Sequence, residues 1–523
     1  MPKLLLLLCL VASLPSKSQQ YDVLIRNGKI VDGTGNSWFY GDVGIVQNKI
    51  VAVGRLQGTA RQTIDATGLI VAPGFIDVHT HIEGNDLLVP TSPNFILDGV
   101  TSVVTGNCGG SNVAVADYFR KIDSVHNSVN IATLIGHNSV RKEVMGEVQR
   151  DPTAEEQKQM EAMVEQAMRE GAVGLSTGLI YVPGTYAKTE EVVGLARAAA
   201  RFGGVYASHI RDEGDRVTEA IEEAINIGRQ AHIPVEISHF KVTYKPNWGK
   251  STSTVAQVER ARLEGVDVTV DQYPYVASST TLSTTLPSWA LSGGLDSLRW
   301  RLTNAATRAR IKKEMLQSLK KKQLKNYSYA VIARYAPDSS YNGKNISEVN
   351  SMKGRKSGAA NEAETILDLV SSTERVQMVY FSMNEDDLKT IMKYPYNMFA
   401  SDAGINRFGA GVPHPRAYGT NARVLGQYVR LLKVISLEEA VRRMTSLPAQ
   451  KFQLRDRGLI REGMAADIVI FDETRVGDQA TFDRPHAYAT GIEYVLVNGM
   501  LTVNKGVHTG ARHGVVLKGP GAK

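Results

Sequence analysis

Short apolar runs alternate with helical stretches from residue 71 onward, and this alternation restricts the possible folds more than any other feature. The stretch 153–171 is rich in Glu, Gln, Met and Ala, as expected of a helix, and 188–202 ends at a Gly-Gly stop signal. Such a pattern is typical of an α/β protein with parallel strands joined by helices. Eight strands are expected, which is the number that a closed (β/α)8 TIM barrel needs. The predicted strands are 72–78, 101–105, 130–135, 172–176, 205–208, 235–238, 266–270 and 397–401.

We predict that the barrel covers residues 71–454. The gap between the seventh and eighth predicted strands is far longer than the others, so we expect an inserted cap at about 285–345. Basic residues outnumber acidic ones between Asp296 and Tyr327, where apolar residues fall near helical spacing. This segment is predicted to form one or two amphipathic helices with a solvated basic face; binding to an anionic surface is the alternative.

The two ends of the chain do not fit the barrel pattern. Residues 19–70 and 455–523 contain alternating apolar runs, with Asn-Gly turn signals at Asn27 and Asn498. We expect the two end segments to join into one small β-domain.

Residues 1–18 have the pattern of a secretory signal peptide. Lys3 precedes an apolar run that is too short to span a bilayer, and small residues precede a plausible cut before Gln19. We therefore expect an exported protein, periplasmic or secreted; a membrane anchor is the alternative. No later segment has the length for stable membrane insertion, nothing resembles a nucleic-acid-binding module, and the sequence does not indicate an oligomeric state.

Candidate metal ligands follow the ends of the predicted strands. Residues two apart in a strand point the same way, so His79 and His81 are expected to leave the first strand on one side. The C-terminal ends of barrel strands meet at one mouth, where such proteins place their chemistry. Imidazoles and a thiolate suit zinc better than magnesium or calcium. Taken singly, each histidine would more often be a packing or surface residue. The candidate ligands are His79, His81, Cys108, His209, His239 and Asp402.

Cys108 and Asp402 gain specific roles in this arrangement. Removing the signal peptide, which contains Cys9, leaves Cys108 as the one cysteine, and a lone thiol in an exported protein would oxidise unless a metal held it as thiolate. A buried small hydrophobic residue is the alternative. Asp402 could accept a proton from water and later donate it to a leaving group, or it could merely cap a helix. His137, at the end of the third strand, is expected to support the ligands rather than to bind the metal.

Seven motifs together resemble a known family. They are Ala-Pro-Gly-Phe-Ile-Asp-Val-His-Thr-His, Thr-Gly-Asn-Cys-Gly, Gly-Leu-Ser-Thr-Gly-Leu-Ile-Tyr-Val-Pro-Gly, Ser-His-Ile-Arg-Asp-Glu, Ile-Ser-His-Phe-Lys, Ala-Ser-Asp-Ala-Gly and His-Pro-Arg-Ala-Tyr-Gly-Thr. With them the chain resembles the amidohydrolase superfamily, and within it the N-acyl-D-amino-acid deacylases, or D-aminoacylases. The resemblance covers nearly the whole mature chain. The loop after Asp402 continues Ile405-Asn-Arg-Phe and departs from the family pattern, which leaves the exact substrate open.

The resemblance implies the cofactor and the site. One zinc would be held tightly by Cys108, His209 and His239, and a second, weaker metal position would lie near His79 and His81, within reach of Cys108 and Asp402. Tyr181, Lys241 and Arg416 would bind the free carboxylate of the substrate, for which two cations and a phenol are suited.

The predicted activity is zinc-dependent hydrolysis of N-acyl-D-amino acids, with Asp402 as the catalytic acid and base. Cyclic-amide hydrolases of the hydantoinase or dihydroorotase type are the nearest alternative, but they use a carboxylated lysine at the fourth strand. That strand is followed here by Thr177-Gly178 without a lysine, and Cys108 offers the bridge instead. A dipeptidase acting on D-residues stays open. A non-catalytic barrel scaffold is disfavoured because the full ligand set is present. The sequence does not indicate the acyl group or the amino-acid side chain.

Overall fold

The computed structural model describes residues 20–372 and 375–522, so the predicted signal peptide at 1–18 lies outside the described residues. All eight predicted barrel strands form, and neighbouring strands pair in parallel in sequence order. They are β6 (Phe75–Asp77), β7 (Val100–Thr105), β8 (Asn130–Thr133) continued by β9 (Ile135–Gly136), β10 (Gly174–Gly178), β11 (Val205–His209), β12 (Val235–Ile237), β13 (Val268–Gln272) and β17 (Asn397–Phe399).

The barrel closes between its first and last strands. A parallel bridge joins Thr80 to Ala403, and the Asp402 amide donates a hydrogen bond to the His79 carbonyl at 2.9 Å. The predicted (β/α)8 fold is therefore confirmed. Closure also brings two of the candidate metal-binding segments, one after each strand, side by side.

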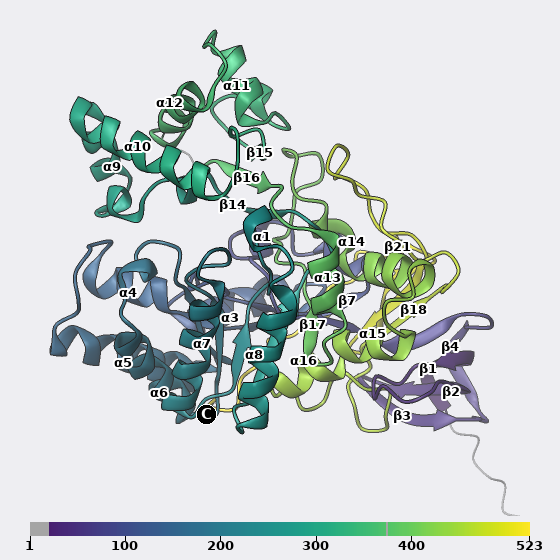
Figure 1. The fold of residues 1–523 in the computed structure, drawn as a ribbon. Helices are drawn as coiled ribbons and strands as arrows, with labels where there is room; N and C mark the ends of the chain where they lie inside the picture. Colours follow the sequence, from purple (N-terminus) through teal and green to yellow (C-terminus); the bar gives the residue numbers. More distant parts are fainter. Residues whose placement is uncertain (1–19, 373–374, 523) are drawn as a thin grey trace, which may run out of the picture.

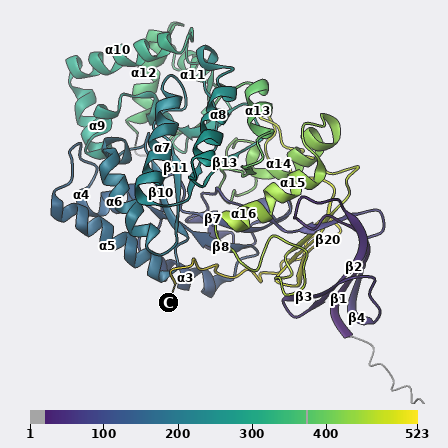
Figure 2. The ribbon, with the colours of Figure 1, turned by 60° about the horizontal axis from the view of Figure 1, so that its bottom comes forward.

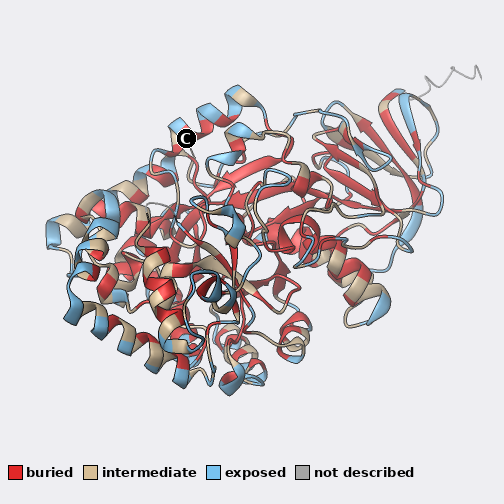
Figure 3. Cartoon of the chain, turned by 90° about the horizontal axis from the view of Figure 1, so that it is seen from above, coloured by how far each residue is buried: buried red, intermediate tan, exposed pale blue. Residues whose placement is uncertain are grey.

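Helices surround the barrel with buried inner faces and exposed outer faces (Figure 3). The predicted helix at 153–171 forms as α5 (Ala154–Glu170). It begins with a capping box between Thr153 and Glu156 and ends at Gly171, whose φ of 115° favours glycine. The other helices of the barrel region are α1 (Asn85–Leu88), α2 (Pro93–Ile96), α3 (Val115–Val125), α4 (His137–Met145), α6 (Thr189–Ala200), α7 (Val217–Ala231), α8 (Ser251–Leu263), α13 (Glu385–Met392), α14 (Arg416–Arg423), α15 (Leu437–Met444) and α16 (Ser446–Lys451).

The first predicted strand, 72–78, is in fact two strands. β5 (Ile70–Pro73) belongs to a separate sheet, and β6 belongs to the barrel. Gly74 lies between them, where a Cβ atom would sit only 2.3 Å from the side chain of Thr101. The chain therefore passes from one sheet to the other at a point of close contact that only glycine permits.

The two ends of the chain contribute to one nine-stranded sheet beside the barrel (Figures 1 and 2). Asn498 and Gly499 form the turn between β19 and β20, whereas Asn27 lies inside β1, at a bulge where pairing with β2 shifts register. The strands are β1 (Gln20–Ile30), β2 (Phe39–Val46), β3 (Lys49–Gly54), β4 (Thr59–Asp65), β5, β18 (Ile468–Phe471), β19 (Ile492–Val497), β20 (Met500–Asn504) and β21 (Val507–His508).

An inserted segment between β13 and β17 forms a cap with its own apolar core, set over one side of the barrel (Figure 1). The basic segment forms two helices, and part of its charge is neutralised because Arg308 pairs with Glu364 and Asp368. The cap elements extend from Ser278 to Tyr380, so the predicted range 285–345 is too short. The basic residues on which that prediction is based lie only in the first half of the cap. The cap elements are β14 (Ser278–Thr281), α9 (Gly294–Thr303), α10 (Ala305–Lys321), β15 (Ala330–Arg334), α11 (Ile346–Met352), α12 (Ala359–Val370) and β16 (Gln377–Tyr380).

None of the helices in the described ranges is long and apolar enough to cross a membrane.

Candidate active site

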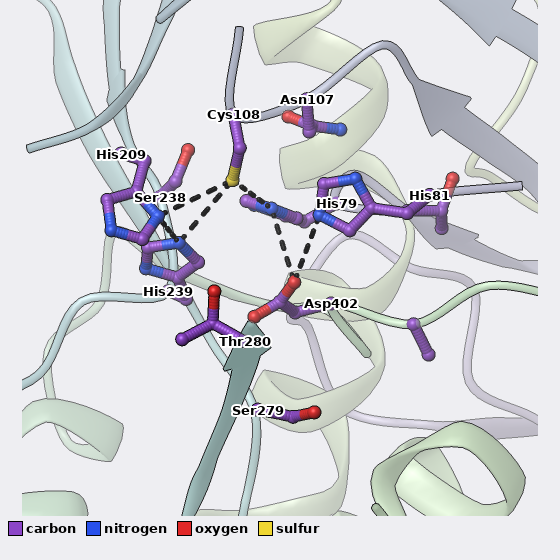
Figure 4. A network of polar contacts seen from close by, with 12 residues as sticks. His79, His81, Asn107, Cys108, His209, Ser238, His239, Ser279, Thr280 and Asp402 are labelled. Atoms are coloured by element: carbon purple, nitrogen blue, oxygen red, sulfur yellow. Dashed lines mark hydrogen bonds and ion pairs between the residues drawn. The ribbon is translucent and has the colours of Figure 1, made fainter. Parts of the chain in front are cut away.

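The structure brings all six predicted metal ligands together at the C-terminal mouth of the barrel (Figure 4). His79 and His81 follow β6, Cys108 follows β7, His209 ends β11, His239 follows β12 and Asp402 follows β17. These parallel strands end at the same rim of the barrel. Six donor side chains from five separate segments therefore lie close together, as the strand-end pattern predicts.

Cys108, His209 and His239 form the first group of donors. Cys108 Sγ lies 3.5 Å from His209 Nδ1 and 3.6 Å from His239 Nε2. Sulfur and nitrogen ligands of one tetrahedral zinc would lie about 3.5 Å apart, given bond lengths of about 2.3 and 2.0 Å. The two ring nitrogens are 2.6 Å apart and would separate by several tenths of an ångström around such an ion. The donor set therefore fits zinc with a small movement of the rings.

His79, His81 and Asp402 form a second group that shares Cys108 with the first. Cys108 Sγ is 3.3 Å from His79 Nε2, and Asp402 Oδ1 is 3.2 Å from His81 Nε2 and 3.6 Å from His79 Nε2. Cys108 thus lies between the two groups, and a carboxylate oxygen of Asp402 lies within 4.8 Å of ligand atoms of both His79 and His239. This arrangement suits one metal position or two neighbouring ones.

Three of these donors have left-handed backbone conformations. The φ angles are 53° at Cys108, 37° at His239 and 50° at Asp402. A non-glycine residue with positive φ is uncommon and costs about 1–3 kcal/mol where the surrounding structure does not relieve it. Such strain gathers at functional sites, where it aims a side chain in a direction that a relaxed backbone would not give.

The charges of the site match a cation. Burial alone would raise the pKa of the Cys108 thiol, but the His79 and His209 rings bring that pKa well below its usual range. Burial would likewise raise the pKa of the Asp402 carboxyl, and Arg416 and His79 instead bring it well below its usual range. Both groups thus favour the deprotonated form that a metal ligand or a general base needs.

Asp271 supports the site and was missed by the sequence analysis. Its Oδ2 lies 3.0 Å from His79 Nδ1, and its Oδ1 accepts a hydrogen bond from the His239 backbone amide at 2.8 Å. A carboxylate on Nδ1 leaves Nε2 of His79 free to face Cys108. The sequence does indicate Asp271 as a candidate, because this residue comes directly after the predicted seventh strand.

The three predicted carboxylate-binding residues lie near the donors but are not equivalent. Tyr181 and Arg416 line the cavity above the metal-binding groups, and Arg416 Nη1 lies 2.7 Å from Asp402 Oδ2. Lys241 is only 4% exposed, and its ammonium contacts Glu213 Oε1 at 2.6 Å and the His239 carbonyl at 2.7 Å. Glu213 was also missed, although it ends the Ser-His-Ile-Arg-Asp-Glu motif.

His137 does not adjoin the metal ligands. Its Nε2 lies 2.8 Å from Glu191, which also binds Arg141, so this buried group stabilises the start of α4 against α6. The predicted supporting role at the metal is wrong, because the third strand turns into α4 at His137 and carries the ring away from the mouth.

A cavity of about 970 Å³ lies over the donors, between the barrel mouth and the cap. His81, Cys108 and Asp402 are among the barrel residues that line it. The cap contributes polar groups, among them Thr280, Arg375 and Gln377, and a wall of apolar side chains. That wall consists of Leu282, Leu286, Leu291, Leu295, Leu298 and Val370.

Residues 62–503 match the sequence profile of the amidohydrolase family. The chain belongs to the amidohydrolase family. This amidohydrolase is 35% identical to D-aminoacylase of Alcaligenes xylosoxydans xylosoxydans, with 96% of this chain and 98% of that relative covered. It is 36% identical to N-acyl-D-glutamate deacylase of the same organism, over 92% of this chain and 93% of the relative.

A solved structure also resembles this amidohydrolase over most of its length. It is N-acyl-D-glutamate deacylase from Bordetella bronchiseptica, complexed with zinc and a phosphonate inhibitor that mimics the tetrahedral intermediate of the reaction. The TM-score is 0.82 at 35% identity, with 96% of this chain and 100% of that chain covered. The resemblance inferred from the seven motifs is thereby confirmed.

Proposed function

We propose that this amidohydrolase uses zinc to hydrolyse the amide bond of N-acyl-D-amino acids, which yields a carboxylate and a free D-amino acid. The observation that carries the proposal is the cluster of Cys108, His209 and His239 beside Asp402 at the floor of a cavity. The similarity to D-aminoacylase and to N-acyl-D-glutamate deacylase over nearly the whole chain supports the same reaction.

Asp402 is the acid and base of the proposed reaction. Its carboxylate is 8% exposed and faces the cavity. One carboxylate oxygen accepts a proton from the attacking water and then gives that proton to the leaving nitrogen, so that a single residue serves both halves of the reaction. Zinc, when bound by the donor groups, supplies Lewis acidity toward the acyl carbonyl.

Arg416 and Tyr181 bind the carboxylate of the substrate in this proposal. Arg416 Nη1 pairs with Asp402 Oδ2 at 2.7 Å, and Nη2 lies 3.5 Å from the Ser279 carbonyl of β14. The Tyr181 hydroxyl exchanges a hydrogen bond with Thr280 on β14 at 3.0 Å. A guanidinium and a phenol that both line the cavity suit an incoming carboxylate. In this proposal the Lys241 ammonium, which contacts the His239 carbonyl, adds positive charge near the substrate carboxylate without touching it.

The apolar wall of the cap favours substrates with an apolar side chain. Arg416 and Tyr181 contact Ser279 and Thr280 of β14, and leucines that follow β14 line the same cavity. In this proposal the substituent on the α-carbon packs against these leucines. Burying hydrocarbon against this wall is favourable by about 25 cal/mol per Å². We therefore expect N-acyl-D-leucine to be a better substrate than N-acyl-D-glutamate.

The cyclic-amide alternative is not favoured by the fourth strand of the barrel. The Ser176 hydroxyl of β10 donates to the Gly106 carbonyl at 2.5 Å and accepts from the Gly109 amide at 3.1 Å, so it anchors the loop that carries Cys108. A serine here cannot supply the bridging group that a carboxylated lysine would. Cys108 occupies the central position between the two donor groups instead.

The experiment that tests the proposal is a panel of N-acetyl-D-amino acids with the L-enantiomers and a hydantoin as controls. We expect release of free amino acid from the D-series, most rapidly with leucine, methionine or phenylalanine side chains. Faster turnover of the hydantoin than of every linear substrate would favour the cyclic-amide alternative.

We further propose that the protein is exported, on the strength of the signal-peptide pattern in residues 1–18. Fractionation of cells that express the full chain tests this. We expect the protein in the periplasm or medium, shortened by about 18 residues as that pattern implies; a full-length cytoplasmic protein would contradict it.

A further inference from the structure

Glu213 lies behind the metal-facing histidines, on the loop that follows β11. Its Oε1 atom is 3.0 Å from His239 Nδ1, 3.9 Å from His209 Nε2 and 2.6 Å from Lys241 Nζ. Its backbone carbonyl accepts hydrogen bonds from the amide of Thr243 at 2.8 Å and from its hydroxyl at 2.9 Å. These bonds fix the loop after β11 against the segment after β12, so that one carboxylate oxygen faces both rings.

The two histidines turn opposite nitrogens toward Cys108. His209 presents Nδ1 and His239 presents Nε2. An imidazole that binds a metal through one nitrogen must carry its proton on the other. The protons would therefore be on Nε2 of His209 and Nδ1 of His239, which are the two nitrogens that face Glu213.

We propose that the Glu213 carboxylate is a positioning residue that holds His209 and His239 in these two opposite tautomers and thereby prepares both rings to bind zinc. Nε2 of His209 is buried without a hydrogen-bond partner, and Glu213 is the carboxylate that it faces. One carboxylate oxygen thus lies within hydrogen-bond distance of His239 Nδ1, at 3.0 Å, and attracts a proton on His209 Nε2 electrostatically from 3.9 Å.

Glu213 also compensates the charge of Lys241, whose side chain is 3% exposed. The ammonium lies 2.8 Å from His239 Nδ1, and two N–H groups cannot donate to each other. With the proton of Nδ1 directed to Glu213, the ammonium keeps Glu213 Oε1 and the His239 carbonyl as acceptors. Removing the carboxylate would leave a buried cation beside a metal ligand, which is costly. A role for Lys241 in binding the substrate carboxylate rests on the proposed function; the role of Glu213 at the two histidines does not.

The neighbouring carboxylate provides a matched control. Asp212 precedes Glu213 in the same motif, but its Oδ1 accepts hydrogen bonds from the backbone amides of Gly214 at 2.7 Å and Arg216 at 3.1 Å. It organises the loop and does not contact either ring. An Asp212→Asn variant keeps the acceptor oxygen and changes the same formal charge as Glu213→Gln.

The test measures zinc affinity by competition with a chelator, and it uses a Lys241→Met background so that no buried ammonium is left unpaired. We expect Glu213→Gln in this background to weaken zinc binding by about 10–100-fold, the usual cost of losing a partner behind a ligand. Asp212→Asn should change it less than twofold. Equal zinc affinity of Lys241→Met and Lys241→Met with Glu213→Gln would overturn the proposal.

Two measurements keep this test decisive. Circular dichroism and the melting temperature of the metal-free variants report whether the fold is kept. If the double variant does not fold, the same comparison of Glu213→Gln with Asp212→Asn is made in a Lys241→Gln background, which also leaves no buried ammonium. Because the probe is zinc alone, the result stands even if no N-acyl-D-amino acid is hydrolysed. Failure of the positioning role and failure of the proposed function are thereby distinguishable.

Discussion

Arg416 and Asp402 form a buried ion pair at the floor of the cavity, with Arg416 Nη1 2.7 Å from Asp402 Oδ2. Arg416 begins α14 and lies over the ring of Tyr273, with its guanidinium carbon 4.5 Å from the ring centroid. The sequence predicts separate roles for the two residues: Arg416 binds the substrate carboxylate, and Asp402 transfers the proton. Under the proposed function, a substrate carboxylate at Arg416 would bind beside Asp402, the proposed acid and base.

The first prediction concerns the metal ligands. Cys108→Ala should lose most bound zinc and most activity, because Cys108 Sγ is shared by both donor groups. His79→Ala should keep much of the tightly bound zinc, since His79 lies outside the group formed by Cys108, His209 and His239. Elemental analysis of the purified variants measures this, and a normal zinc content in Cys108→Ala would rule out the assignment.

The second prediction concerns proton transfer. Asp402→Asn should retain zinc in the Cys108 group but lose about 10²–10⁴-fold or more in kcat, the usual contribution of a general acid–base group. Single-turnover kinetics together with zinc analysis separate the two effects. Wild-type turnover by Asp402→Asn on the best substrate would show that another group carries the proton.

The third prediction concerns substrate charge. Arg416→Ala should lower kcat/KM strongly for an N-acyl-D-amino acid and far less for the analogue whose carboxylate is a neutral amide, because only the charged substrate needs the guanidinium. The wild-type enzyme should itself use the neutral analogue poorly. The comparison needs kcat/KM for both substrates on both proteins. If both substrates lost activity equally, Arg416 would act through Asp402 or the fold and the carboxylate role would be abandoned.

The fourth prediction concerns Lys451, a buried residue at the end of the barrel opposite the site. Burial lowers its pKa to about 8, although Asp267 partly opposes this shift. The unfolded chain, with a lysine pKa of about 10.4, therefore binds more protons between pH 8 and pH 10, so the folded state gains stability as pH rises through this window. The apparent Tm of the wild type should rise relative to that of Lys451→Met from pH 8 to pH 10. A constant difference would contradict the shifted pKa.

The strand ends were predictable from the sequence because they depend on local pattern. An apolar run followed by histidine, cysteine or aspartate identifies the end of a barrel strand, and the topology then brings those ends together. Asp271 obeys the same rule and could have been found by it. Glu213 follows His209 by four residues on an irregular loop, so that no periodicity indicates which way its side chain points.

Other features depend on contacts between distant segments. The break at Gly74 is imposed by Thr101, and no local signal divides the apolar run 72–78 into two strands. The bulge at Asn27 has the same residue pair as the turn at Asn498, and only the pairing of β1 with β2 distinguishes them. The cap extends as far as α12 and β16 because both pack on its apolar core. The basic residues of α9 and α10 give no indication of this packing.

The most direct test of the account is the turnover of N-acetyl-D-leucine measured while zinc is added back to metal-free protein. We predict that release of D-leucine rises from baseline as zinc occupies the Cys108, His209 and His239 group, and that N-acetyl-L-leucine stays near baseline throughout. Full activity without bound zinc, or equal hydrolysis of the two enantiomers at saturating zinc, would contradict the account.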